Sequence, residues 1–231
     1  MLQILFGEGD MVSKLTDLAL YIIVILVSLS VHEWAHAFTA HLNGDDTARN
    51  MGRMTVNPLK HLEPIGMLML LVFGFGWAKP VPVNPSRYRK YRLGEFTVSF
   101  AGIFANLVIA FTAAVAFAVT ALISLKNGVE APKNLYSLFM YFGVINCALA
   151  IFNLLPIYPL DGSHIFELLF GKLIGAKAVM WIHSHGRLLL YALFAVSFVL
   201  SRMGISLISD SAGWLFLRFY YLASLIVGSF A

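Results

Sequence analysis

The sequence predicts an all-α polytopic membrane protein with about five to six transmembrane helices and a short re-entrant or β-hairpin insertion after the first. The first observation is composition: of 231 residues, 59% are hydrophobic and 12% are charged, whereas soluble domains carry about 25% charged residues. The second is a mean hydropathy of +0.80. The third is a series of apolar windows of about twenty residues, the length that crosses a bilayer as a helix.

Five of these windows are long enough to cross. The expected crossings are residues 15–42, 96–125, 135–157, 188–207 and 213–231, with a sixth crossing as the main alternative. The apolar stretch between Pro64 and Lys79 is too short to span, so we expect it to be re-entrant or interfacial. Ser163–Gly175 is also too short to span with its own apolar residues.

Lysine and arginine placement predicts the orientation of these helices. Residues 43–95 carry half of the chain's 16 Lys and Arg residues, and the expected loop 172–187 adds further basic side chains. The opposite loop, 126–134, has few. The positive-inside rule therefore places 43–95 and 172–187 in the cytoplasm and the N-terminus outside. We expect an integral, multi-pass protein of the lipid bilayer, in the cell membrane of a prokaryote.

The chain is expected to form a single domain, residues 1–231, with a core at about 15–175 and C-terminal helices at about 188–231. The acidic N-terminus shows no cleavage pattern, so we do not expect a removed signal peptide. Basic residues cluster beside the hydrophobic spans, which argues against nucleic acid as a partner despite the net charge of +4. Cys147 is the only cysteine, which excludes an intrachain disulfide and a thiolate-rich metal site.

Polar residues interrupt the first expected span at His32-Glu33-Trp34-Ala35-His36, which matches the pattern H-E-x-x-H. Residues four apart on a helix share a face, so both imidazoles can reach one metal ion. Glu33 lies beside them, where it can accept a proton from an attacking water instead of binding the metal. Such groups are costly inside a span, and zinc would satisfy them together. The alternative is a polar cluster that is hydrogen-bonded to neighbouring helices.

A third metal ligand should come from another segment at the same depth, since hydrolytic zinc sites usually have three protein ligands and one water. Asp161 lies just past the cytoplasmic end of span 135–157, on the side where the charges place the H-E-x-x-H pattern. Two prolines break the helix before it, and membrane proteins tolerate freed backbone groups only around a cavity. The alternative for Asp161 is a helix N-cap for Ser163–Gly175.

Together these motifs resemble the site-2 protease family of intramembrane zinc metalloproteases, in its compact bacterial and archaeal form without a PDZ domain. The resemblance rests on H-E-x-x-H, on N-x-x-P-x-x-x-L-D-G at Asn153–Gly162 and on the order of the spans, and "GRMTVNPLKHLEPIG" and "GWAKPVPVNP" add to it. It covers roughly residues 20–170.

The resemblance implies one zinc ion per chain, held by His32, His36 and Asp161, with Glu33 as the catalytic base and the site towards the cytoplasm. It also implies that the partner is a transmembrane protein or peptide, cleaved in or near its transmembrane segment. Two positions depart from the family. Ile103 replaces the proline of a glycine-proline pair ahead of Asn106, and His164 follows L-D-G-S where arginine is expected.

Further residues are candidates for substrate contacts. Asn153 could donate to the oxyanion or hold the substrate backbone, and Asn106 is a second candidate. The alternative for each is an interhelical hydrogen bond. Thr55 and Val56 could form a short hairpin edge that pairs with an extended substrate, and the alternative there is a surface turn.

Two other functions fit the same ligands: a divalent-metal transporter and a non-catalytic zinc-binding membrane scaffold. A transporter needs polar residues that continue to the far side, and spans 96–125 and 188–207 offer few. A closed zinc site with four protein ligands would favour the scaffold function, and the sequence supplies no obvious fourth ligand. The remaining histidines are not expected to bind metal; they are His41, at the water boundary, and His61, His164, His183 and His185, in or near cytoplasmic segments.

Overall fold

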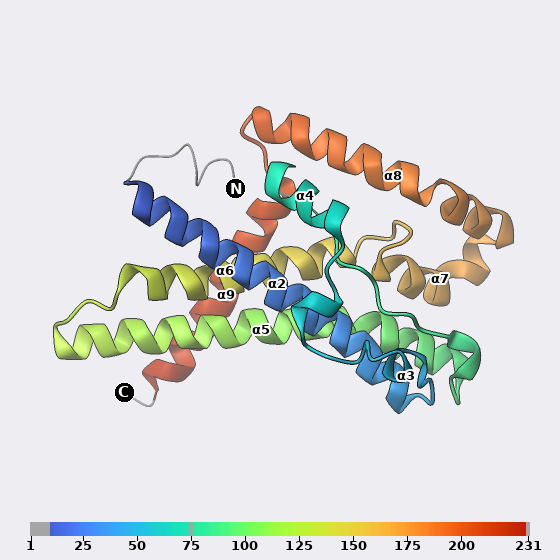
Figure 1. Cartoon of the computed structure of the whole chain (residues 1–231), viewed down its shortest axis with the longest axis horizontal. Coiled ribbons are helices and arrows are strands. Elements are labelled where there is room, and N and C mark those ends of the chain that lie inside the picture. The colour runs from blue at the N-terminus through green and yellow to red at the C-terminus, as the bar shows by residue number, and fades with distance from the viewer. Residues whose placement is uncertain (1–9, 74–75, 230–231) are drawn as a thin grey trace.

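The computed structural model describes residues 10–73 and 76–229, which form helices joined by turns and irregular segments (Figure 1). The α-helices are α2 (Met11–Leu42), α3 (Thr47–Asn50), α4 (Pro64–Phe73), α5 (Tyr91–Asn127), α6 (Lys133–Asn153), α7 (Asp161–Ile174), α8 (Ala176–Arg202) and α9 (Leu207–Gly228). Two 3-10 turns, η1 (Pro58–Lys60) and η2 (Pro85–Arg87), lie between α3 and α5. The described residues include no strand.

Five helices, α2, α5, α6, α8 and α9, are long and apolar enough to cross a membrane, which confirms the predicted number of crossings and the multi-pass character. One prediction about their bounds is wrong. α8 begins at Ala176, so most of the segment 172–187, expected as a loop, is helical. Its lysine, histidine and arginine side chains lower the local hydropathy, but such residues do not break a helix.

The ends of the helices follow from local chemistry. Asp10 caps α2, since its carboxylate accepts a hydrogen bond from the Ser13 backbone N–H at 2.9 Å. Gly128, with a φ of 64°, ends α5 in the left-handed conformation that glycine adopts without a steric penalty. α6 ends at Asn153, before Pro156, and the chain turns through residues 154–160 before α7 begins.

The centre of the molecule is α5, which packs against α2, α6, α7 and α9. Small residues line its contact with α6 and α9, and a single aromatic ring fills the remaining space; the buried residues are Ala110, Ala114, Ala118, Cys147, Ala212, Phe216 and Ala223. Small side chains let membrane helices approach closely, which increases the packing contact that replaces the hydrophobic effect in lipid. By contrast, α8 packs mainly against α7 and is exposed over most of its length.

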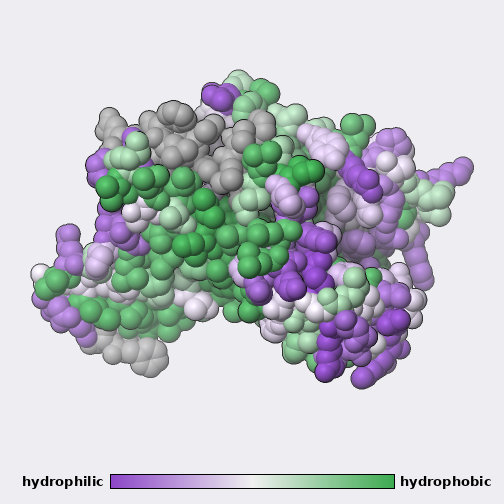
Figure 2. Space-filling view, viewed as in Figure 1, coloured by the Kyte–Doolittle hydropathy of each residue, from purple (hydrophilic) through white to green (hydrophobic). Residues whose placement is uncertain are grey.

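The distribution of hydrophobic residues on the surface agrees with a protein that spans a membrane. Figure 2 shows hydrophobic residues over the middle of the long axis and a concentration of hydrophilic residues at the end where α3 lies. The irregular segments that lead into α7 approach that same end in Figure 1. The structure therefore brings the turn after α2 and the segment that leads into α7 towards one end of the molecule, whereas the α5–α6 connection lies at the other end (Figure 1).

The predicted re-entrant or β-hairpin insertion is not supported, since the described part of residues 43–90 contains no strand. In its described part this segment contains α3, η1, α4 and η2 with irregular backbone between them, and α4 is a ten-residue helix that is not one of the candidate spans. Proline gives the physical reason, because it has no N–H to donate to a hairpin ladder. The prolines of the segment are Pro58, Pro64, Pro80, Pro82 and Pro85. Gly74 and Phe75 lie outside the described residues.

The packing of α6 on α9 gives a testable prediction. A methyl group at Gly143 would overlap the ring of Phe216, so Gly143→Ala should destabilise the protein by about 1–3 kcal/mol. Gly213→Ala on α9 is the matched control, because nothing lies near that position and alanine favours a helix. Thermal unfolding in detergent measures both variants, and equal Tm values would contradict the close contact.

Candidate active site

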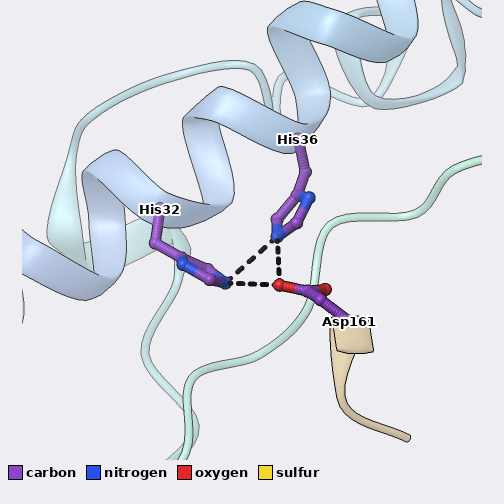
Figure 3. Close-up of side chains that lie close together, drawn as sticks. All are labelled: His32, His36 and Asp161. Atoms are coloured by element: carbon purple, nitrogen blue, oxygen red, sulfur yellow. Dashed lines mark hydrogen bonds and ion pairs between the residues drawn. The ribbon is translucent and has the colours of Figure 1, made fainter. Parts of the chain in front are cut away.

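Two histidines on α2 face one another at the centre of the candidate site (Figure 3). His32 and His36 are one helical turn apart, and their Nε2 atoms lie 3.0 Å from each other. Both side chains are buried, with exposed fractions of 5% and 8%. The i, i+4 spacing thus directs two imidazole nitrogens towards the same position, as the H-E-x-x-H pattern predicts.

Asp161 completes this group from the first residue of α7. Its Oδ2 atom lies 3.4 Å from Nε2 of His32 and 3.3 Å from Nε2 of His36. The alternative role as an N-cap does not apply, since Leu160 occupies the cap position without a side-chain hydrogen bond. Gly162 contributes to this placement, because a side chain there would overlap the carbonyl of Leu154 and force open the turn that carries Asp161.

The geometry of the three groups fits a zinc ion. Tetrahedral zinc with bonds of about 2.0–2.1 Å holds its ligand atoms about 3.3 Å apart. The three ligand atoms are separated by 3.0, 3.3 and 3.4 Å. Asp161 Oδ2 is buried and has no hydrogen-bond partner, as expected of an atom that a cation would satisfy. Among the described residues this is the one group of three or more His, Cys, Asp or Glu with metal-binding spacing.

Helix α5 orients the His36 ring. The Nδ1 atom of His36 lies 2.7 Å from the carbonyl oxygen of Val98, which can only accept, so Nδ1 carries the hydrogen. The lone pair of the neutral ring is therefore on Nε2, the nitrogen that faces Asp161. Gly102 lies one turn further along α5, and a Cβ atom there would overlap both imidazole rings. The two rings thus rest on the bare backbone of α5.

Asn106 contacts the second ring. This fully buried side chain has its amide nitrogen 3.2 Å from Nδ1 of His32, while its Oδ1 has no partner. The two ends of an amide are interchangeable in shape. With the oxygen turned towards His32, Oδ1 accepts from Nδ1–H and leaves the Nε2 lone pair for a metal. The structure places Asn106 against a ligand ring, and its predicted contact with substrate stays a prediction.

Glu33 follows His32 on α2 and contacts the insertion. Its Oε2 atom accepts a hydrogen bond of 2.7 Å from the backbone N–H of Val81. The side chain is partly exposed, unlike the two histidines beside it. Glu33 is therefore held next to the three clustered side chains without being one of them, as expected for a base that does not bind the metal.

The other predicted substrate residues are not members of this group, and their roles stay predictions. The Nδ2 atom of Asn153 donates to the carbonyl of Leu149 on its own helix, at 3.0 Å. The Thr55 carbonyl oxygen accepts from His61 Nε2 at 2.7 Å, so this part of the proposed edge is already bonded. Val56 is exposed.

Three of the five remaining histidines pair with carboxylates outside the cluster. His41 lies 2.6 Å from Asp46, His164 lies 3.1 Å from Glu95 and His183 lies 2.9 Å from Glu167. The hydrogen bond with Glu95 raises the pKa of His164, which outweighs the effect of burial. His164 therefore links α7 to α5 beside the site, at the position where the family pattern has arginine.

Sequence reasoning missed several groups of the site, and most of them are backbone atoms. The Val98 carbonyl and the Val81 N–H carry no residue-type signal, so no motif could have indicated them. A missed side chain beyond the group of His32, His36 and Asp161 is Asn146 on α6, fully buried, whose amide donates to the Ser28 hydroxyl on α2 at 2.8 Å. An asparagine in a predicted span was the available signal, because buried amides in membranes bond between helices.

Comparisons with known proteins find peptidase and metalloprotease relatives. Residues 118–193 match the family model of peptidase family M50. YwhC of Bacillus subtilis strain 168, which is named as a zinc metalloprotease, is 39% identical over 173 residues, covering 75% of this chain and 78% of YwhC. Rip2 of Mycolicibacterium smegmatis, named in the same way, is 31% identical over 169 residues, covering 69% of this chain and 61% of Rip2.

A second relative of that name, Rip2 of Mycobacterium tuberculosis H37Rv, is 30% identical over 166 residues and is covered to 61% of its length. The match to peptidase family M50 includes Asp161 and ends before α9, whereas the histidines of α2 lie outside it. No solved structure matches the chain.

The packing of the His32 and His36 rings against α5 gives a second prediction. Gly102→Ala should lower zinc affinity at least about tenfold, because the added methyl group displaces both imidazoles by more than a ligand bond tolerates. Zinc content after dialysis against a graded chelator series, measured by plasma mass spectrometry, gives the affinity. Gly213→Ala is again the control. Wild-type zinc retention by Gly102→Ala would contradict the contact.

Proposed function

The chain belongs to peptidase family M50, the site-2 protease family, and from this membership we propose that it is a zinc-dependent intramembrane endopeptidase that hydrolyses peptide bonds in or near transmembrane segments of membrane proteins. Family membership and the five apolar helices identify the chain as a zinc metalloprotease of a multi-pass membrane type. The proposal adds where this protease cuts and which substrates it accepts.

A single observation carries the proposal: the His32, His36 and Asp161 group lies between helices that are long and apolar enough to cross a membrane. Two of its members belong to a candidate span, and the third starts the helix that follows another. Polar side chains inside a membrane span cost free energy. A protease that acted only on soluble chains would gain nothing from placing its metal-binding residues there. A substrate within the membrane accounts for that placement.

The residues of the site divide the chemistry between them. His32, His36 and Asp161 would hold one zinc ion per chain, which supplies a Lewis acid that polarises a carbonyl and acidifies water. Glu33 accepts the proton of the attacking water on its carboxylate and passes it to the leaving amine. Val98 and Asn106 keep the histidine rings in the orientation that exposes Nε2.

A substrate helix must unwind before attack, because its carbonyls are engaged in its own hydrogen bonds. Asn153 would donate to the developing oxyanion or hold the extended backbone, and the partly exposed segment at Thr55 and Val56 would pair with that backbone through the groups that His61 leaves free. Lysine and arginine placement supports an orientation with the N-terminus outside and the site towards the cytoplasm of a prokaryotic cell.

The two rival functions have less support. A closed structural zinc site would require a fourth protein ligand, and the group in the described residues has three members, which leaves a position for water. The interior of α5 beyond Asn106 offers a transporter no further ionisable side chain before Lys126. Both observations favour hydrolysis over transit or storage of the metal.

The third prediction separates the base from the ligands. Glu33→Gln should keep zinc and lose cleavage by at least about a thousandfold, because the amide cannot accept the proton. Asp161→Ala should lose both zinc and cleavage. The measurement is cleavage of a panel of transmembrane peptides by purified protein in detergent and in liposomes, with zinc content determined on the same samples.

Asp46→Asn serves as the control, since Asp46 lies at the surface and pairs with His41 and Arg49 away from the site. Wild-type cleavage rates in Glu33→Gln would remove Glu33 from the mechanism. Wild-type zinc content in Asp161→Ala would remove Asp161 from the ligand set. Cleavage of soluble peptides with no preference for transmembrane substrates would argue against the intramembrane assignment while leaving the metalloprotease intact.

A further inference from the structure

An extended segment, residues 79–84, crosses the catalytic face of α2 and is called the strap below. Its sequence is Lys79-Pro80-Val81-Pro82-Val83-Asn84, followed by Pro85, and it has no helix or strand hydrogen bonding. The strap is hydrogen-bonded to Glu33 through the backbone N–H of Val81. The two residues are 48 positions apart in the sequence, so this bond differs from the local turns of the insertion.

Proline spacing sets the shape of the strap before any contact forms. A residue that precedes proline is confined to extended backbone, and proline itself has a fixed φ near −65°. Lys79, Val81 and Asn84 all precede prolines. Because prolines carry no N–H, the strap has few donors left, and the N–H of Val81 is the one aimed at Glu33. The direction of this donor is thus largely set by sequence.

Both ends of the strap are anchored to the rest of the insertion. At the first end, the Lys79 N–H donates to the His61 carbonyl at 2.8 Å, and the Arg53 guanidinium donates to the Lys79 carbonyl at 2.8 Å. At the other end, the Asn84 N–H donates to Asp45 Oδ2 at 2.6 Å. Val81, between these anchors, is buried with an exposed fraction of 8%.

Asp45 is a buried carboxylate with no role in the metal group. Its exposed fraction is 1%, and its second oxygen accepts from the backbone and the hydroxyl of Thr47. It therefore joins the first turn after α2 to the far end of the strap. Hydrogen bonds from Thr47 and Asn84 outweigh burial and lower the pKa of Asp45, so it is a charged acceptor at neutral pH.

The bond to Val81 uses one oxygen of Glu33 and leaves the other free. The Val81 N–H reaches Oε2, and no described residue donates to Oε1. A carboxylate fixed through one oxygen presents the second in a defined direction, which is what a general base requires. A freely rotating glutamate would spend part of its time in rotamers that face away from the water.

We propose that the strap is a positioning element for the catalytic base: the Val81 N–H holds Oε2 of Glu33 so that Oε1 faces the attacking water, and Asp45 holds the strap in register. This inference rests on the proposed function, because it assigns a role in peptide hydrolysis. Val81 and Asp45 are positioning residues, since they act through Glu33 and neither belongs to the group of His32, His36 and Asp161.

The decisive test removes one N–H. Replacement of Val81 by its α-hydroxy acid, introduced by nonsense suppression into the full chain, puts an ester oxygen where the N–H was and keeps the side chain. The expected result is a kcat about 10- to 100-fold lower with KM and zinc content unchanged, because only the orientation of the base is affected. Val81→Ala keeps the N–H, so it should retain most of the wild-type activity that the ester variant loses.

Two comparisons separate positioning from general structural support. The same ester at Val83, whose N–H donates to no described residue, should cost far less kcat than the ester at Val81. Asp45→Ala should lower kcat in the same way as the Val81 ester. Asp46→Asn changes its partly exposed neighbour and should stay within about twofold of wild type. Thermal stability of each protein is measured beside its kinetics.

The outcomes are distinguishable. Equal losses of kcat from the two esters, or a loss of zinc from the Val81 ester, would mean that the strap only supports the fold and would overturn the proposal. Unchanged kcat in the Val81 ester would do the same while leaving the protease assignment intact. Failure of the wild-type protein to cleave any transmembrane peptide would overturn the proposed function and this inference with it.

Discussion

The contact between α2 and α5 at Gly102 is the constraint on which the site depends. Both imidazoles lie against the backbone of α5 at a position where a single methyl group would overlap them, and the Val98 carbonyl on the same helix fixes the His36 ring. α5 is also the helix against which α6, α7 and α9 pack. The ligand geometry is therefore coupled to the packing of the whole membrane domain, because a shift of α5 would move both rings.

Irregular backbone supplies what the helices cannot. A helix engages its own N–H and C=O groups, so it cannot direct a backbone donor at a neighbour from its interior. Here the turn 154–160 delivers Asp161 to the histidines, and the proline-rich segment after α4 delivers the N–H of Val81 to Glu33. The two breaks lie far apart in sequence but serve adjacent residues of α2.

Hydropathy and motif spacing anticipated the five crossings and the cluster of His32, His36 and Asp161, since apolar length and the i, i+4 rule are local properties. They failed at α8, whose polar first turns resemble a loop in composition but remain helical. They also failed in residues 43–90, where an expected hairpin gave way to short helices and extended proline-rich chain. In both cases hydropathy was informative about polarity but not about backbone conformation.

Sequence by itself determined the membrane class and predicted the metal-binding residues and the base, because these follow from residue type and short-range spacing. Only the tertiary structure decided what holds these groups in place: the carbonyl of Val98, the N–H of Val81 and the amide of Asn106. The reason is physical. Backbone donors and acceptors are the same at every non-proline residue, so their function depends on which side chain the fold brings to them.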